Sequence, residues 1–242
     1  MSAAAVATPA NASPRNPNAD TAPGAGPDPE PLEHFNGLGG FAADGREYVI
    51  RLKPDAAGWP TLPPLPWTNV IANPGFGCLV SETGAGFTWS GNSREHRLTP
   101  WLNDPLLDPH GEALYVRDED DGRVWSPQPG PMPAAAAYEV RHRAGATSWK
   151  LAAHGLEHRT TVFVPADAPV RVAWVEITNR DTRPRRLRIV SYQRFVLGGL
   201  AGEPGPTTSC DAALGAVLAR NPLAGDFARP VAWAAVVAPA GA

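Results

Sequence analysis

The chain contains little cysteine, little net charge and no long apolar run. Its two cysteines, Cys78 and Cys210, are far apart and lack the spacing of metal ligands, so a disulfide-built secreted domain is not indicated and a reducing compartment is expected. The net charge of −3 gives no electrostatic reason to expect nucleic acid or an anionic membrane as a partner. No stretch of about 18 apolar residues occurs, so we expect no transmembrane helix in this chain.

Common cofactor and metal motifs are also missing. The glycine-rich residues 36–41 match neither dinucleotide nor nucleotide spacing, and no Gly-x-Ser-x-Gly motif occurs. His154 and His158 have helical metal-site spacing, but Gly155 and the strand-like sequence after it argue against a helix. The acidic residues 118–121 lack the ligand spacing of a calcium loop. We therefore expect no cofactor and no metal ion.

Proline and glycine are abundant, with 28 and 24 residues, which favours short strands and turns over long helices. Residues 1–31 are rich in Ala, Pro, Asn and Gly and contain no aromatic residue, so we expect a disordered tail. A signal peptide is not indicated, because the basic start is absent and the apolar residues 3–7 are too few. The sequence thus predicts one folded domain over residues 32–242.

Beyond residue 32 the dominant pattern is an alternation with period two. It predicts about eleven short strands, hence an all-β protein built as a large antiparallel β-sandwich. The expected strands are residues 48–52, 70–71, 76–80, 113–117, 124–125, 138–142, 148–151, 157–164, 170–178, 187–197 and 231–237.

Turn residues predict how several of these strands connect. Hairpins are expected at residues 73–75, 121–122, 144–145 and 179–184. Trp174-Val175 interrupts the alternation of its strand, which suggests a bulge or burial on both faces. Residues 211–220 are the one segment with a helical pattern. We expect most of the eight tryptophans to lie in the core or at its rim.

Residues 91–105 form the segment that most suggests a binding site. Two prolines indicate a loop, and the loop is denser in polar and aromatic groups than a connection requires. Asn, Asp and Arg side chains can each bridge neighbouring sugar hydroxyls, and Trp can cover the C–H face of a pyranose. The candidate site residues are Arg94, Glu95, His96, Arg97, Trp101, Asn103 and Asp104. Alternatively, the loop is polar because it is exposed, with Trp101 and Leu98 anchored in the core.

Three carboxylates in or near this loop, Glu95, Asp104 and Asp108, are close enough in sequence to suggest an acid–base pair. A glycosidase pair is defined by the separation of its carboxyl groups in space. The sequence does not give that separation, so we assign none of the three a catalytic role.

Seven sequence blocks in order resemble the N-terminal supersandwich domain of glycoside hydrolase family 94, formerly glycosyltransferase family 36. The blocks are FNGLGGF at 35–41, DGREYVI at 44–50, PWTNVIANP at 66–74, FTWSGNSR at 87–94, LTPWLNDP at 98–105, GEALY at 111–115 and NPLAGDF at 221–227. This family contains cellobiose, chitobiose and β-1,2-oligoglucan phosphorylases and the phosphorylase-like region of cyclic β-1,2-glucan synthases. The resemblance implies a galactose-mutarotase-like supersandwich.

The resemblance also implies that catalysis takes place outside this chain. Family members are inverting phosphorylases in which a carboxylic acid on an (α/α)6 barrel protonates the glycosidic oxygen and inorganic phosphate, as co-substrate, attacks the opposite face. We expect that barrel to be absent from residues 32–242, so no residue is assigned as catalytic. This chain alone is expected to be inactive, although it belongs to a family of glycoside phosphorylases.

The implied partners are a β-glucan oligosaccharide, a barrel domain supplied in cis or in trans, and a second copy in a homodimer. In such an assembly residues 94–104 would form a rim of the active site that contacts sugar. The expected location is the cytoplasm, or the inner membrane if the domain is part of a glucan synthase. The alternative is a stand-alone carbohydrate-binding or structural module without a catalytic partner.

Overall fold

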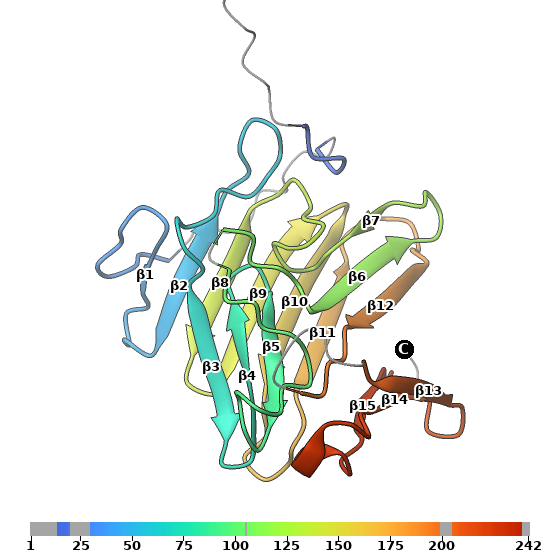
Figure 1. The fold of residues 1–242 in the computed structure, drawn as a ribbon. Helices are drawn as coiled ribbons and strands as arrows, with labels where there is room; N and C mark the ends of the chain where they lie inside the picture. The colour runs from blue at the N-terminus through green and yellow to red at the C-terminus, as the bar shows by residue number, and fades with distance from the viewer. Residues whose placement is uncertain (1–13, 20–29, 105, 199–204, 239–242) are drawn as a thin grey trace, which may run out of the picture.

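The computed structural model describes residues 14–19, 30–104, 106–198 and 205–238. These residues form fifteen β-strands and one 3-10 helix, η1 (Gly225–Phe227), and every strand pairs with its neighbours antiparallel (Figure 1). The expectation of an all-β antiparallel sandwich is confirmed. Most of the expected tail, residues 1–13 and 20–29, lies outside the described residues.

A six-stranded sheet forms the back layer of the molecule in Figure 1. Its order is β1 (Gly39–Phe41), β2 (Glu47–Leu52), β8 (Tyr138–Arg143), β9 (Ala146–Ala153), β10 (Leu156–Phe163) and β11 (Val172–Asn179). Strands β8 to β11 follow one another along the chain, whereas β2 joins them through a long crossover.

Three smaller sheets complete the structure. They are β3 (Thr68–Asn73), β4 (Phe76–Ser81) and β5 (Gly86–Ser90); β12 (Leu187–Gln193), β6 (Glu112–Asp118) and β7 (Val124–Trp125); and β13 (Thr207–Asp211), β14 (Ala216–Arg220) and β15 (Ala232–Ala235). Figure 1 shows β3 to β5 in front of the six-stranded sheet, with β6, β7 and β12 beside them. The Asn69 amide of β3 fixes the two layers together, because it donates to Arg143 O and Ala146 O in the β8–β9 hairpin.

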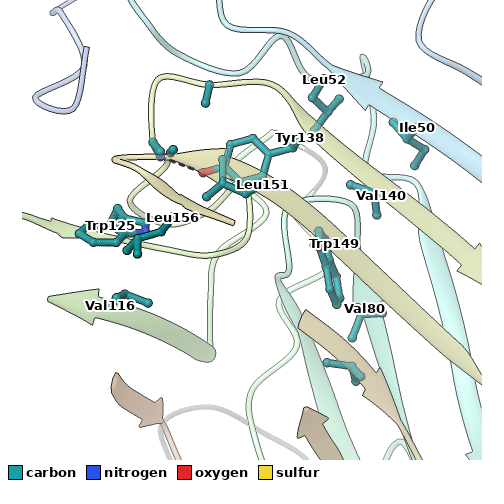
Figure 2. Packing of buried hydrophobic residues seen from close by; sticks show 14 of the residues in the cluster. Ile50, Leu52, Val80, Val116, Trp125, Tyr138, Val140, Trp149, Leu151 and Leu156 are labelled. Atoms are coloured by element: carbon teal, nitrogen blue, oxygen red, sulfur yellow. Dashed lines mark hydrogen bonds between the residues drawn. The ribbon is translucent and has the colours of Figure 1, made fainter. Parts of the chain in front are cut away.

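The core lies between these layers and draws on both (Figure 2). Its largest fully buried side chains include Trp125, Tyr138 and Trp149. Each of these three has a polar atom that needs a partner in the interior, and each has one. The Trp149 indole donates to Glu82 O at 2.8 Å, the Trp125 indole to the His158 ring at 3.3 Å, and the Tyr138 hydroxyl accepts from Ala134 N at 2.8 Å.

Turn chemistry explains the local hairpins. The turns at residues 73–75, 121–122 and 144–145 connect β3 to β4, β6 to β7 and β8 to β9, as expected. Gly122 and Gly145 have φ angles of 77° and 75°, which glycine adopts without the steric cost that other residues carry. Residues 179–184 are different, and the expected hairpin there is wrong: β11 pairs with β10 and β12 pairs with β6, so the turn passes the chain from one sheet to another.

Two further expectations are corrected. Residues 211–220 form no helix, because Asp211 ends β13 and its carboxylate accepts the backbone N–H groups of Ala213 and Leu214 in a tight turn that leads into β14. Trp174 causes no bulge, since the register with β10 runs unbroken through it and its side chain is 57% exposed. Among the other tryptophans, Trp233 is also more than half exposed.

No helix in the described part of the chain is long and apolar enough to cross a membrane.

Candidate functional site

The candidate loop connects β5 to β6 and begins with a tight polar turn. The Asn92 carboxamide oxygen accepts the backbone N–H groups of Arg94 at 2.9 Å and Glu95 at 3.0 Å, and Asn92 O accepts His96 N at 3.0 Å. Asparagine favours such turns because its side chain replaces a backbone acceptor. This turn directs the Arg94 and Glu95 side chains outward, and they are 87% and 56% exposed. The two form an ion pair, with Arg94 Nε 3.2 Å from Glu95 Oε1.

His96 points inward and fixes the loop to the C-terminal part of the chain. It is 3% exposed, its Nδ1 lies 2.9 Å from Ser90 O, and its ring stacks on Phe227 of η1 at a centroid distance of 4.4 Å. A buried ring with a backbone partner and an aromatic neighbour is a structural anchor. His96 therefore does not lie on the outer side of the loop, and its expected contact with sugar stays a prediction.

Arg97 and Trp101 brace the middle of the loop. The Arg97 guanidinium donates to Ser93 O at 3.1 Å and to Trp101 O at 3.2 Å, and its Cζ lies 5.6 Å from the centre of the Phe87 ring. Trp101 stacks on the same Phe87 ring with a centroid distance of 5.3 Å. Phe87 thus contacts two loop residues, and cation–π and stacking contacts hold both against β5.

Two aspartates shape the far end of the loop. Asp104 Oδ1 accepts the backbone N–H groups of Leu106 and Leu107, and these hydrogen bonds lower the pKa of its carboxyl group. The Asp108 carboxylate accepts hydroxyl hydrogen bonds from Ser81 and Thr83, each at 2.6 Å. Asp108 is therefore committed to the turn that follows β4, and Glu95 is paired with Arg94. The structure brings no two of the three candidate carboxylates into a hydrogen-bonded pair.

The seven predicted site residues thus separate into two groups. His96, Arg97 and Trp101 face the protein and hold the loop in place. The other four, Arg94, Glu95, Asn103 and Asp104, lie along the outer side of the loop and are exposed or half-buried. Asn103 adopts a φ of 50°, which asparagine tolerates better than most residues do. Leu102, next to it, is 57% exposed.

A buried polar network beneath the loop was not predicted from the sequence. Glu112 on β6 accepts hydroxyl hydrogen bonds from Thr88 at 2.6 Å and Thr99 at 2.7 Å through Oε1. Its Oε2 lies 2.7 Å from a terminal guanidinium nitrogen of Arg171, and the two side chains are only 6% and 14% exposed. The network joins β5, β6, the loop and the start of β11. Its one available signal was Arg171, a charged residue inside the apolar residues 168–175.

The four residues of this network line an open cavity of about 670 Å³. His96, Leu98 and Thr99 contribute from the loop, and the apolar side of β11, the strand β12 and the segment around β15 form the remaining walls. Arg171 Nε is buried there without a hydrogen-bond partner. Burial raises the pKa of the neighbouring Cys78 thiol to about 11; the charge of Arg171 lowers this pKa, and the charge of Glu112 raises it. The cavity therefore combines apolar residues with several uncharged polar ones, among them Gln128 and Gln193, and with the Glu112–Arg171 ion pair.

Among the residues that the structure describes, no three His, Cys, Asp or Glu side chains come together as a metal site.

Comparison with known proteins identifies the family. The family model described as Glycosyl hydrolase 94, supersandwich domain, matches residues 46–241. The chain belongs to glycoside hydrolase family 94. The match covers all strands from β2 to β15 and the whole candidate loop.

The curated relatives are one synthase and several phosphorylases. The cyclic beta-(1,2)-glucan synthase NdvB of Rhizobium meliloti is 37% identical over 199 residues, which is 81% of this chain and 7% of the synthase. The N,N'-diacetylchitobiose phosphorylase of Vibrio furnissii is 30% identical over 68% of this chain and 20% of the enzyme, and the solabiose phosphorylase of Paenibacillus borealis is 29% identical over 68% and 21%. The chain thus spans about a fifth or less of the length of these relatives.

Proposed function

We propose that this family 94 supersandwich is a non-catalytic domain, spanning residues 32–242, that contacts a β-glucan oligosaccharide through the outer side of residues 91–104. The proposal follows from the family and from the names of the relatives, a β-1,2-glucan synthase and several disaccharide phosphorylases. In this reading the glycosidic bond is broken elsewhere, on an (α/α)6 barrel in cis or in trans, where inorganic phosphate is the nucleophile. The domain supplies a rim to that site.

One observation carries the proposal: the loop is held rigidly from below and is polar above. His96, Arg97 and Trp101 fix its path, so the outward groups are presented in a set geometry. Rigid presentation favours binding, because less conformational entropy is lost when a ligand settles on the surface. Arg94 and Asn103 supply donors for sugar hydroxyls, and Glu95 and Asp104 supply acceptors.

The setting of the domain follows the same reasoning. We propose that it docks on its barrel and takes part in the contact of a homodimer, in the cytoplasm or at the inner membrane within a glucan synthase. The exposed apolar residues Leu102, Leu106 and Leu107, which are 57%, 87% and 75% exposed beside the polar rim, suit such a contact.

The test is glycan binding by the isolated chain and turnover by a full-length relative. Titration calorimetry with linear β-1,2-gluco-oligosaccharides should show binding that Arg94→Ala and Asp104→Ala each weaken by roughly tenfold or more, as loss of a hydrogen bond to a charged group predicts. The equivalent changes in a relative should slow oligoglucan phosphorolysis without lowering its Tm.

Arg188→Ala is the matched control. Arg188 is also a solvated arginine, 63% exposed against 87% for Arg94, but it lies on β12 and pairs with Glu119. It should leave the affinity unchanged. Binding that survives both loop substitutions would place the sugar elsewhere, and no binding to any β-glucan, with unchanged turnover in the relative, would reduce the domain to a structural module.

A further inference from the structure

Residues 14–19 pack against residues 57–59, 124 and 133–135 at one end of the sandwich, and these contacting residues are called the groove below. The sequence of the segment, Pro-Arg-Asn-Pro-Asn-Ala, cannot form a core. Two asparagines of this segment are almost fully buried: Asn16 is 2% exposed and Asn18 is 5% exposed. Asparagine is rarely buried to this extent unless its amide is satisfied. Figure 1 shows the segment as a short blue turn above the ends of the strands.

The amide groups of the two asparagines are satisfied by backbone carbonyls from three separate parts of the fold. Asn16 Nδ2 donates to Gly58 O at 2.7 Å and to Pro133 O at 3.2 Å. Asn18 Nδ2 donates to Pro133 O at 3.1 Å and to Val124 O at 3.3 Å. The segment thus joins the loop after β2, the strand β7 and the loop before β8.

The backbone of the segment also forms hydrogen bonds with the loop after β2. Asn16 N donates to Ala57 O at 2.9 Å, and the Trp59 indole donates to Pro14 O at 2.7 Å. Within the segment, Asn16 Oδ1 accepts Asn18 N at 2.9 Å and Asn16 O accepts Ala19 N at 3.0 Å, which closes a compact Asn-Pro-Asn turn. The groove therefore contacts both the backbone and the side-chain amides of the turn.

The groove has its own internal support. The Asp55 carboxylate accepts the N–H groups of Ala57 and Trp59, and Asp55 N donates to Trp59 O at 2.7 Å. On the other side Ser126 N donates to Met132 O at 2.6 Å. None of these bonds involves residues 14–19, so the carbonyl acceptors stay in place when the turn leaves.

We propose that this groove, formed by residues 57–59, 124 and 133–135, is a peptide-binding site for an Asn-Pro-Asn turn, and that residues 14–19 occupy it as a docked segment. The site fastens the chain that precedes the sandwich to the end of the fold formed by the loops around Trp59 and Pro133. Because the turn is tethered through residues 20–29, its local concentration is high, and modest intrinsic affinity suffices to keep it bound.

The first test releases the turn in the full chain. Asn16→Ala/Asn18→Ala removes the four amide donations described above and leaves the residues of the groove unchanged. Limited trypsin digestion should then cleave after Arg15 at least about tenfold faster than in the wild type, because several hydrogen bonds hold the peptide bonds around Arg15. Cleavage after Arg94, whose side chain is 87% exposed, gives the internal control and should not change. Equal cleavage after Arg15 in both proteins would overturn the proposal.

The second test adds the turn in trans. A labelled PRNPNA peptide should bind the double variant, whose groove is open, at least about tenfold more tightly than the wild type, whose own segment competes. A PRAPAA peptide should not bind. Equal binding of PRNPNA to both proteins, or none to the variant, contradicts a separable site.

A third test compares two glycine variants, to distinguish crowding between the groove and the turn from backbone strain. A Cβ added at Gly58 would lie 3.0 Å from Ala135 Cβ of the groove, 3.0 Å from Ala19 Cβ and 3.3 Å from Asn16 Cβ of the turn, and the φ of Gly58 is 87°. Gly45 has a comparable φ of 67° but nothing within 4 Å of its added Cβ. Gly58→Ala should therefore expose Arg15 to trypsin and Gly45→Ala should not. Equal trypsin cleavage after Arg15 in both variants would mean that backbone strain alone, and not crowding between the groove and the turn, is being measured.

Discussion

Glu82 carries a carboxyl group into the interior at the turn between β4 and β5, where it is 2% exposed. Burial raises its pKa from the usual 4.5 to about 7, although hydrogen bonds to backbone N–H groups, including Trp67 N at 2.7 Å, oppose the shift. Because the folded pKa lies above the unfolded one, the folded state holds the proton more tightly. Glu82 therefore favours folding fully below pH 4.5, and this advantage is lost as the pH rises through 7.

The corresponding prediction concerns Glu82→Gln. Glutamine keeps the acceptor for Trp67 N and cannot ionise, so the variant should gain stability relative to the wild type as the pH rises from 4.5 to 7.5. The gain should approach about 3 kcal/mol, the free energy that matches the pKa shift. Urea denaturation of both proteins at several pH values measures it.

The comparison between the two proteins is essential, because four histidines act in the opposite direction. Burial lowers the pKa values of His110, His142, His154 and His158, so these rings destabilise the fold as the pH falls below their unfolded values. Their contribution cancels in the difference between variant and wild type. A difference that does not depend on pH would show that the Glu82 carboxyl is not desolvated.

The Glu112–Arg171 pair leads to a second prediction at this scale. Arg171→Met leaves the Glu112 carboxylate buried without its cation, which should cost about 3–5 kcal/mol of folding free energy. Adding Glu112→Gln removes the unpaired charge and keeps an acceptor for Thr88 and Thr99, so the double variant should recover much of the loss. Urea denaturation at pH 7 checks both. A double variant less stable than Arg171→Met would contradict the assignment of the loss to an unpaired charge.

Individual residues show what the sequence could and could not predict about the site. The polarity of Arg94, Glu95 and Asn103 was readable from composition, because exposed loop residues contact no distant part of the chain. The inward orientation of His96 was not, since its partner Phe227 lies far along the sequence. The same holds for Glu112 and Arg171, since Glu112 lies on β6 and Arg171 directly precedes β11, which belongs to a different sheet.

At the scale of elements, the pairing of β4 with β5 depends on a close backbone approach at Gly86. A Cβ added there would lie 1.9 Å from Leu79 O on the neighbouring strand, and Gly86 also has a φ of 149°. Gly86→Ala must therefore separate the two strands or distort them, and we expect a loss of at least about 3 kcal/mol or failure to fold. Urea denaturation, or the yield of soluble protein, measures this.

Gly75→Ala is the matched control in the adjoining β3–β4 hairpin. No atom lies within 4 Å of its added Cβ, and its φ is not in the positive range. Its effect should stay within about 1 kcal/mol and can be stabilising, because alanine restricts the unfolded chain. Comparable losses in both variants would mean that the β4–β5 contact is not what makes Gly86 necessary.

Elements also explain which parts of the fold were predictable. Hairpins formed by neighbouring strands follow from local turn residues, as at Gly122 and Gly145. The pairing of β2 with β8 and of β12 with β6 follows from packing of the whole core and has no local signal. The turn at residues 179–184 has hairpin composition, yet it connects two sheets: β11 ends the six-stranded sheet, and β12 pairs with β6 instead of with the other edge of β11.

At the scale of the whole molecule, apolar side chains are unevenly distributed over the surface. Many of the exposed ones lie in the later part of the chain, on β12 and on and around β15; Ile189 is 40% exposed, Trp233 55% and Val237 88%. These three also line the open cavity beneath the candidate loop. An exposed apolar surface of this kind, continuous with a cavity of about 670 Å³, is typical of a binding face.

This distribution predicts that the protein in its folded state binds the apolar dye anilinonaphthalene sulfonate. Trp233→Lys should lower the dye fluorescence, because it places a charge in the wall of the cavity. Trp174→Lys is the control: Trp174 is 57% exposed, against 55% for Trp233, but it lies on the face of β11 opposite to the cavity-lining Ala173 and Val175. If both variants reduce the fluorescence equally, the dye reports scattered apolar residues and the cavity is not a distinct binding face.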